Sequence, residues 1–558
     1  MASQEHHNLA TTESRPSTHR NKYDLEEFER NDGRPAFVLT FTEVKLLGIA
    51  GVGFFLDAYD LFIINPVTLM LQYRLYGGGH LPARYEGFVK AGANIGSVIG
   101  QFLFGFLADS LGRKAVYGKE LMLIILATIL TMTTPTGSLS PEGSLIYLGI
   151  FRILLGIGVG GDYPMSATIT SDRANLRKRG TMLAYIFSNQ GWGSFMGSLV
   201  TLIVLACYKG TMEAGHTSKV DGVWRIIVGI SLIPAFGTLY QRLTLPESTR
   251  YISSQKKDQE DNQDEIDRLK KLQHESDTEI RSEETAATNE KEKAAVEVGE
   301  RPSTVDKSAT DAIVDPNADP MEVATNKAHF KEFIAYFSQW KHFKLLIGTS
   351  MCWLLLDVAF YGINLNQNVV LQQIGFDGKT GSPWTRLFKT STGGMIITAL
   401  GFVPGYYASI LTIEYLGRKW IQIQGFLAAA LFLGILAGQF NELSKVSFIV
   451  CFALLQFFFN FGANTTTYCY PAEVFPTRFR AFAHGISAAC GKVGAIISAL
   501  AFNTLSQDIG TPAVLWIFFG CCIMGAVFTL LLPEVKGRDP DVILAEEIRE
   551  MREAKNRK

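Results

Sequence analysis

The hexapeptide Asp109-Ser-Leu-Gly-Arg-Lys114 returns in the second half of the chain as Glu414-Tyr-Leu-Gly-Arg-Lys419. Each copy stands between two long apolar stretches and keeps the same order of an acidic residue, a glycine and two basic residues. A second pair of segments repeats at a similar spacing, Pro246-Glu-Ser and Pro533-Glu-Val, and each of them closes an apolar region. The chain is therefore expected to consist of two related halves. We also match Arg179-Gly180 with His484-Gly485.

Most of the chain between these repeats is apolar. Of the 558 residues, 47% are hydrophobic and 19% are charged, and the charged residues concentrate near the termini and in the middle. A helix needs about 20 apolar residues to cross the hydrocarbon core of a membrane, and in lipid its backbone must be hydrogen-bonded within the segment. We therefore predict an all-α membrane protein with twelve spans, near residues 44–66, 88–108, 116–135, 145–167, 181–207, 224–245, 344–365, 390–413, 420–440, 446–469, 482–503 and 513–532.

The distribution of charge divides the chain into five parts. The central part is rich in Glu, Lys, Asp, Ser and Thr, and it cannot bury enough apolar surface to fold, so we predict that it is largely disordered. Lys and Arg concentrate in the even-numbered short loops, which places both termini and the central part in the cytoplasm. The predicted parts are an N-terminal tail, a six-helix bundle, a linker, a second six-helix bundle and a C-terminal tail, at 1–43, 44–245, 246–342, 343–532 and 533–558.

Several classes of function are not indicated. The seven cysteines form no CxxC pair and have no histidine-rich companion, so neither a metal site nor a disulfide framework is expected. The net charge of −1 gives no sign of a nucleic-acid partner. No nucleophile–base pair points to an enzyme, and no cofactor is expected. The glycine run from Gly156 to Gly161 lies in an apolar stretch, where it favours close helix packing over nucleotide binding.

Ionisable side chains inside predicted spans are the candidate site residues, because such groups are costly in a membrane unless they are paired or face water. Asp57 and Asp60 share a helix face, and two carboxylates in a poorly hydrated site favour uptake of a proton. Arg152 is separated from Asp162 by about 15 Å along a helix, so we expect it to pair with a carboxylate on another helix. The candidates are Asp57, Asp60, Glu120, Arg152, Asp162, Asp357 and Lys492.

The second half carries a stripe of Trp353, Asp357 and Tyr361 at helical spacing, and a lysine within an apolar span. A lone ammonium at Lys492 would pair with Asp357, with the substrate, or with each in turn. Tyrosine, glutamine, asparagine and tryptophan donors elsewhere in the spans suit an oxyanion that accepts many hydrogen bonds. An anionic cargo is therefore expected, with carboxyl groups supplying the proton.

The two loop hexapeptides and Pro246-Glu-Ser resemble the motifs of the major facilitator superfamily. That resemblance implies two pseudo-symmetric six-helix bundles, with a substrate site between them near the membrane midplane. It also implies that the loop charges latch helix ends on the cytoplasmic side. The motif positions are Asp109, Gly112, Arg113, Lys114, Glu414, Gly417, Arg418 and Lys419.

Three longer segments resemble the phosphate:proton symporters of this superfamily, the fungal and plant high-affinity phosphate permeases. They are Ala50–Phe62, Gly160–Asp172 and Trp353–Gly362, and the departures at Met165, Thr170 and Asp172 remove no charge. The resemblance implies contacts with phosphate from Tyr163, Gln190, Trp353, Asp357, Tyr361, Asn464 and Lys492. It further implies a proton path through Asp57, Asp162, Arg152 and Glu120, to which we add Asp60.

The expected function is import of inorganic phosphate with protons across the plasma membrane by alternating access. A glycerophosphodiester or another organic anion is the alternative cargo within the superfamily. A sugar is less expected, because the seventh span lacks a Gln-Gln-x-Ser-Gly pattern and because a neutral sugar would give the charge of Lys492 no role. The alternative of another class is a receptor that binds phosphate and transports little. The expected partners are phosphate, protons and the lipid bilayer.

Overall fold

The computed structural model describes residues 35–245 and 330–556, apart from residues 175, 368–370, 372, 374 and 377–380. The described residues are mainly helical, and no strand occurs among them. Within these described residues, twelve helices are long and apolar enough to cross a membrane, in agreement with the predicted number of spans. Each agrees with a predicted range, although several extend further at one or both ends. Residues 246–329, which include Pro246-Glu-Ser and most of the predicted linker, lie outside the described residues.

The first half supplies six of these crossings. Its first crossing is divided at Ile63, and several helices begin at a polar residue whose side chain accepts a backbone N–H, as Thr40 and Ser140 do. The helices are α1 (Phe41–Phe62), α2 (Ile64–Tyr76), α3 (Ala83–Leu111), α4 (Arg113–Val116), α5 (Lys119–Met132), α6 (Pro141–Arg173), α7 (Arg179–Cys207), α8 (Lys209–Glu213), η1 (Thr217–Lys219), α9 (Val220–Ile230) and α10 (Leu232–Leu243).

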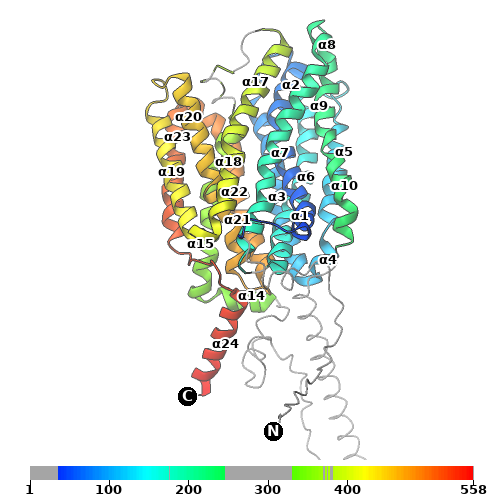
Figure 1. The fold of residues 1–558 in the computed structure, drawn as a ribbon. Coiled ribbons are helices and arrows are strands. Elements are labelled where there is room, and N and C mark those ends of the chain that lie inside the picture. The colour runs from blue at the N-terminus through cyan, green and yellow to red at the C-terminus, as the bar shows by residue number, and fades with distance from the viewer. Residues whose placement is uncertain are drawn as a thin grey trace, which may run out of the picture.

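The second half supplies the other six. Two further helices flank it, α14 and α24. The first of them occupies residues that we assigned to the linker, because its aromatic side chains pack against Phe479 and Phe482. The helices are α14 (Phe330–Phe337), α15 (Trp340–Asn364), α17 (Pro383–Ile397), η2 (Thr398–Phe402), α18 (Val403–Leu416), α19 (Arg418–Gly438), α20 (Lys445–Asn460), α21 (Ala463–Val474), α22 (Arg480–Asp508), α23 (Thr511–Thr529) and α24 (Pro540–Asn556). Figure 1 shows α4, α14 and α24 at one end of the bundle and α8 at the other.

Glycines bring α3 and α6 into backbone contact. A Cβ atom on Gly160 would lie 2.3 Å from the carbonyl oxygen of Ser97, and one on Gly96 would lie 1.9 Å from that of Ile153. Larger residues at these positions would force the two helices apart. The glycine run of α6 therefore acts in helix packing, as its apolar setting predicts.

The two loop hexapeptides adopt the same geometry. Gly112 and Gly417 have φ of 96° and 84°, a region that favours glycine. The arginine that follows each glycine pairs with an acidic residue near the end of another helix: Arg113 with Asp172, and Arg418 with Glu473 at 2.7 Å. We call the end of the bundle where Gly112 and Gly417 lie the motif end.

The match of Arg179-Gly180 with His484-Gly485 is wrong by a few residues. Arg179 and Arg480 are the first residues of α7 and α22, two helices of 29 residues each, so these arginines are the equivalent pair. His484 instead lies one turn inside α22, where its ring packs edge-on against Trp353.

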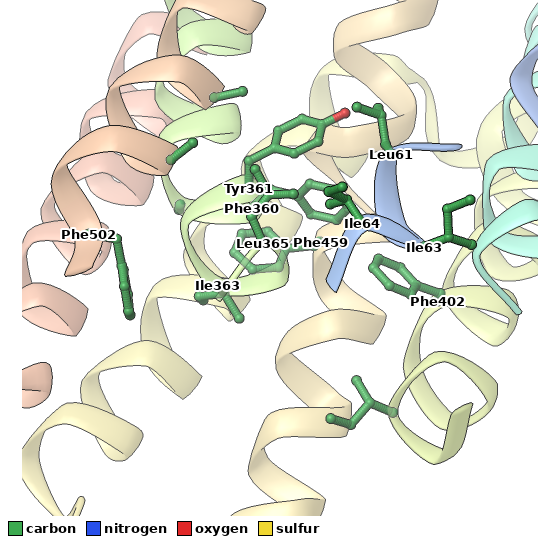
Figure 2. Close-up of a cluster of buried hydrophobic side chains, with 14 of the residues drawn as sticks. Leu61, Ile63, Ile64, Phe360, Tyr361, Ile363, Leu365, Phe402, Phe459 and Phe502 are labelled. Atoms are coloured by element: carbon green, nitrogen blue, oxygen red, sulfur yellow. The ribbon is translucent and has the colours of Figure 1, made fainter. Parts of the chain in front are cut away.

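The two halves are joined at both ends of the bundle. At the motif end, Arg480 pairs with Asp172 at 2.6 Å, and the backbone N–H of Phe482 donates to Asp109 at 2.8 Å. At the opposite end, the Trp384 indole donates to the carbonyl of Leu205 at 2.7 Å. Buried side chains from both halves, including Ile64, Phe360 and Phe402, pack together on this side, as Figure 2 shows. The interior between the halves is therefore closed toward both ends.

Candidate functional site

Lys492 lies between the two halves and not at the surface. Its side chain on α22 is buried, with 1% of the residue exposed. The ammonium donates to the hydroxyl of Tyr361 on α15 at 2.7 Å and to that of Tyr163 on α6 at 3.3 Å. It also lies 4.5 Å and 4.8 Å from the centroids of the same two rings. A buried cation is thus held by uncharged oxygens and ring faces, and an anion bound beside it would stabilise its charge further.

A chain of hydrogen bonds runs from Asp57 across the interface of the halves. Tyr163 donates to the Asp57 carboxylate at 2.6 Å and accepts from the Gln190 amide at 3.3 Å. The Gln190 oxygen accepts from Tyr406 at 2.8 Å, and Tyr406 accepts from Asn464 at 2.8 Å. Tyr406 escaped the sequence analysis, because a phenol in an apolar span usually packs in the core. The only signal for it was its place in the eighth predicted span.

Asp357 and Trp353 complete this group from α15. The tryptophan ring centroid is 6.2 Å from that of Tyr163. Asp357 is 1% exposed, and among the described residues its Oδ2 atom has no hydrogen-bond partner. The described structure also contains no ion pair between Asp357 and Lys492. Asp357 is nevertheless close enough to interact with the charge of Lys492.

Asp162 and Glu120 belong to a separate cluster that centres on Arg242. The guanidinium donates to Asp162 at 2.5 Å and to Glu120 at 3.2 Å, and all three side chains are buried. Gly53 makes room for the cluster, since a Cβ atom there would overlap the Asp162 carboxylate. Sequence reasoning missed Arg242. It lies in the sixth predicted span and met the same criterion, but arginines near the end of a span usually extend to the membrane surface.

Asp60 and Arg152 form a third group, away from Tyr163. Arg152 donates to the backbone carbonyls of Asp60 at 3.1 Å and Val89 at 3.0 Å. The expectation that it pairs with a carboxylate on another helix is met only in part: Arg152 interacts with the charge of Asp60 on α1, but its hydrogen bond there goes to the main chain. Asp60 and Arg152 line a small cavity inside the first half. Asp57 and Asp60 are thus neighbours on α1 with different surroundings.

The chemistry available to the central group is binding, not bond cleavage. It offers one ammonium, three phenols, two amides and an indole around two carboxylates. Among the described residues, no group of three or more His, Cys, Asp or Glu side chains could hold a metal ion. This arrangement can hold a small polar or anionic molecule between the halves, and closed contacts on either side can exclude water.

A closed site between two six-helix halves defines a carrier of the major facilitator type. The proton:xylose symporter XylE is similar in fold, with a TM-score of 0.63 and 19% identity over 91% of this chain and 98% of that one. An inward-open XylE structure from E. coli gives a TM-score of 0.59 at 18% identity, over 91% and 99% of the two chains. These likenesses concern the fold alone.

The family model described as "Sugar (and other) transporter" matches residues 46–306 and 286–544, and the chain belongs to this family of the major facilitator superfamily. It is a membrane transporter and not an enzyme. A putative inorganic phosphate transporter of Schizosaccharomyces pombe is 46% identical, over 90% of this chain and 88% of its own length. The inorganic phosphate transporter PHO84 of Saccharomyces cerevisiae is 39% identical, over 88% and 83%. A repressible high-affinity phosphate permease of Neurospora crassa is 36% identical, over 88% and 85%.

Proposed function

We propose that this chain imports inorganic phosphate together with protons across the plasma membrane, with both termini in the cytoplasm. The observation that carries the proposal is the buried ammonium of Lys492, held between Tyr163 of one half and Tyr361 of the other. Relatives of nearly the same length are named phosphate transporters. A bound phosphate would take hydrogen bonds from the ammonium and from the phenols and amides around it.

The geometry supports a direct link between phosphate and one proton. Tyr163 donates to Asp57 and accepts from Lys492, so it connects a carboxylate to the cation that would bind the anion. When phosphate enters, the neighbouring negative charge favours protonation of Asp57. When phosphate leaves toward the cytoplasm, Asp357 is the nearby group that can balance Lys492, and Asp57 can release its proton.

The balance of buried charge supports proton uptake as well. The three buried groups contain five carboxyl groups, Asp57, Asp60, Glu120, Asp162 and Asp357, and three cations, Arg152, Arg242 and Lys492. The excess is two acids (five minus three). Uncompensated charge in a dry interior is costly, and an entering anion increases the excess. Protons can reduce this excess, because a carboxyl group binds a proton without needing a metal site.

The contacts that close each end support alternating access. The ion pair between Arg480 and Asp172 would break when the motif end opens, and the hydrogen bond from Trp384 to Leu205 would break when the opposite end opens. The halves would then rock about the central group. In this proposal the motif end faces the cytoplasm, and the two loop hexapeptides act as its latch.

The test is uptake of labelled phosphate by the purified full-length chain in vesicles, with and without an inward proton gradient. We expect accumulation above equilibrium only with the gradient. The variant Asp57→Asn should lose accumulation yet keep exchange of phosphate at equal concentrations on both sides. Accumulation that is independent of the gradient would contradict proton coupling. Binding without transport would favour a receptor, and stronger competition by glycerophosphodiesters than by phosphate would favour the alternative cargo.

A further inference from the structure

A second polar pocket lies between the halves, on the side of the central group away from the motif end. It is formed where α1 meets α2, by α7 and by α17 with η2. With the open space at its mouth it encloses about 520 Å³. Part of that volume is open solvent, so an oxyanion held there would keep some of its water. We call it the outer pocket, and its polar lining consists of Asn65, Ser194, Ser198, Thr201, Gln367, Thr390, Ser391 and Thr398.

An aromatic layer separates the outer pocket from Lys492. Phe62 lines the pocket and stacks on Tyr361, with ring centroids 6.3 Å apart and planes 15° apart. Phe402 adds a third ring, 6.0 Å from that of Phe62. Tyr361 accepts the hydrogen bond from Lys492 through its hydroxyl, and Figure 2 shows Tyr361 as part of the hydrophobic cluster that includes Phe402. The pocket and the central group are therefore on opposite sides of one layer of side chains.

The hydroxyls of the outer pocket are of two kinds. Those of Ser198, Thr201, Thr390 and Thr398 donate to carbonyl oxygens of their own helices, at 2.7 to 3.3 Å. Within the described residues, by contrast, the hydroxyls of Ser194 and Ser391 have no hydrogen-bond partner. They come from α7 of the first half and α17 of the second, and 5% and 8% of these residues is exposed. Two free donors from different halves thus line one pocket.

The charges around the outer pocket suit a weakly held anion. Its lining contains no charged side chain, so the anion would meet neutral donors and its own waters. Arg386 and Lys389 precede Ser391 on α17 by five and two residues, and these cations would attract anions toward this end of the bundle. A site on a transport path must bind firmly enough for entry and weakly enough for release. Neutral hydroxyls meet that requirement next to the stronger site at Lys492.

We propose that the outer pocket is a waiting site, in which hydrated phosphate is held by Ser194 and Ser391 before the Phe62–Tyr361 layer opens. This inference rests on the proposed function. Phosphate would lose the remainder of its water as it passes the aromatic layer and reaches the ammonium. Removing the two hydroxyls should therefore slow the capture of phosphate, while its final binding at Lys492 stays as strong as before.

The test compares three full-length proteins in vesicles: the wild type, the double variant Ser194→Ala/Ser391→Ala, and Thr201→Val. Thr201 lines the same pocket, but its hydrogen is already donated to Gly197 at 2.7 Å, so Thr201→Val is the matched control. Initial rates of phosphate uptake give kcat/KM, and equilibrium binding to purified protein gives Kd. Thermal unfolding shows whether each variant is folded.

For the double variant we expect kcat/KM to fall by about 3- to 10-fold, the loss that follows from one or two neutral hydrogen bonds. The rate at saturating phosphate and the equilibrium Kd should stay at wild-type values, and Thr201→Val should match the wild type throughout. An unchanged kcat/KM would overturn the waiting site. So would a Kd that rises by the same factor, since the change would then lie in the central group. A wild type that neither binds nor carries phosphate would instead remove the proposed function, and this inference with it.

Discussion

Replacing Lys492 by glutamine removes the cation of the central group while keeping a side chain of similar length that can still donate hydrogen bonds. In the structure the ammonium contacts Tyr163 and Tyr361, and Asp357 lies close enough to interact with its charge. After the change, a phosphate in this position would face two buried carboxyl groups without a counter-charge. We therefore expect a large loss of phosphate affinity with little loss of folding.

The size of the loss follows from the type of contact. A hydrogen bond between a charged donor and a buried acceptor contributes about 1.5–3 kcal/mol, and about 1.4 kcal/mol corresponds to a tenfold change in Kd. Lys492→Gln should therefore weaken phosphate binding by about 10- to 150-fold. Adding Asp357→Asn should restore part of the affinity, because it removes a negative charge that the lysine no longer balances.

The assay is equilibrium binding of labelled phosphate to purified protein, with thermal unfolding as a check on the fold. Lys90→Gln is a matched control. Lys90 is another buried lysine within a span, 2% exposed, but it pairs with Glu86 on its own helix at 2.7 Å. Its replacement should leave Kd within about twofold, since no charge near the central group changes. If Lys492→Gln binds phosphate as tightly as Lys90→Gln does, the assignment of the oxyanion to this ammonium is wrong.

Three further predictions concern stability. Arg242→Gln should lower the free energy of unfolding by about 3–5 kcal/mol, because it leaves Asp162 and Glu120 buried without their cation. Thermal unfolding should show Asp162→Asn recovering part of that loss, and equal unfolding temperatures of the single and double variants would argue against the pairing. Gly160→Val should destabilise the fold by about 1–3 kcal/mol, since its Cβ would lie 2.3 Å from the Ser97 carbonyl oxygen. Gly210→Ala, which meets nothing within 4 Å, should not, and similar melting of the two would contradict the packing argument. Burial raises the pKa of Glu547 on α24, but hydrogen bonds from His342 and Lys341 outweigh it and lower the pKa below its usual value. Their stabilisation of α24 is then present above the unfolded pKa and is lost as pH falls through the folded one. Glu547→Gln should therefore increase proteolysis of α24 at neutral pH, and similar cleavage of variant and wild type there would refute the docking.

The sequence predicts the architecture well because its signals are local and repeated. Twelve apolar stretches of sufficient length define the spans without knowledge of how they pack. The hexapeptides at Asp109 and Glu414 establish two related halves, because each lies between the second and third spans of its half and a loop motif of similar sequence adopts the same backbone geometry. The weaker match at His484 failed, because a short Gly-containing pair has little information and only the helix starts at Arg179 and Arg480 fix the correspondence.

The candidate site is only partly accessible to sequence reasoning. The cost of charge in lipid identifies Asp57, Asp357 and Lys492 one by one. Which groups share a cluster depends on how each helix is rotated about its axis and on how deep each residue lies in the membrane. The periodicity of a single helix gives neither the rotation nor the depth. For this reason the hydrogen bonds of Arg152 to main-chain carbonyls were not predicted, and Arg242 was overlooked.

The sequence by itself determined that this chain crosses a membrane twelve times in two similar halves and that it carries a few ionisable groups within apolar spans. Hydrophobic length and repeated motifs are properties of one segment at a time, so no tertiary information was needed. Only the tertiary structure decided that Tyr163 connects Asp57 with Lys492 and that Arg242 forms ion pairs with Asp162 and Glu120. It also decided that the rings of Phe62 and Tyr361 separate the outer pocket from the central group. These relations join residues far apart in the chain and exist only in the packed fold, and those with Lys492 and Tyr361 also need the two halves to pack against each other.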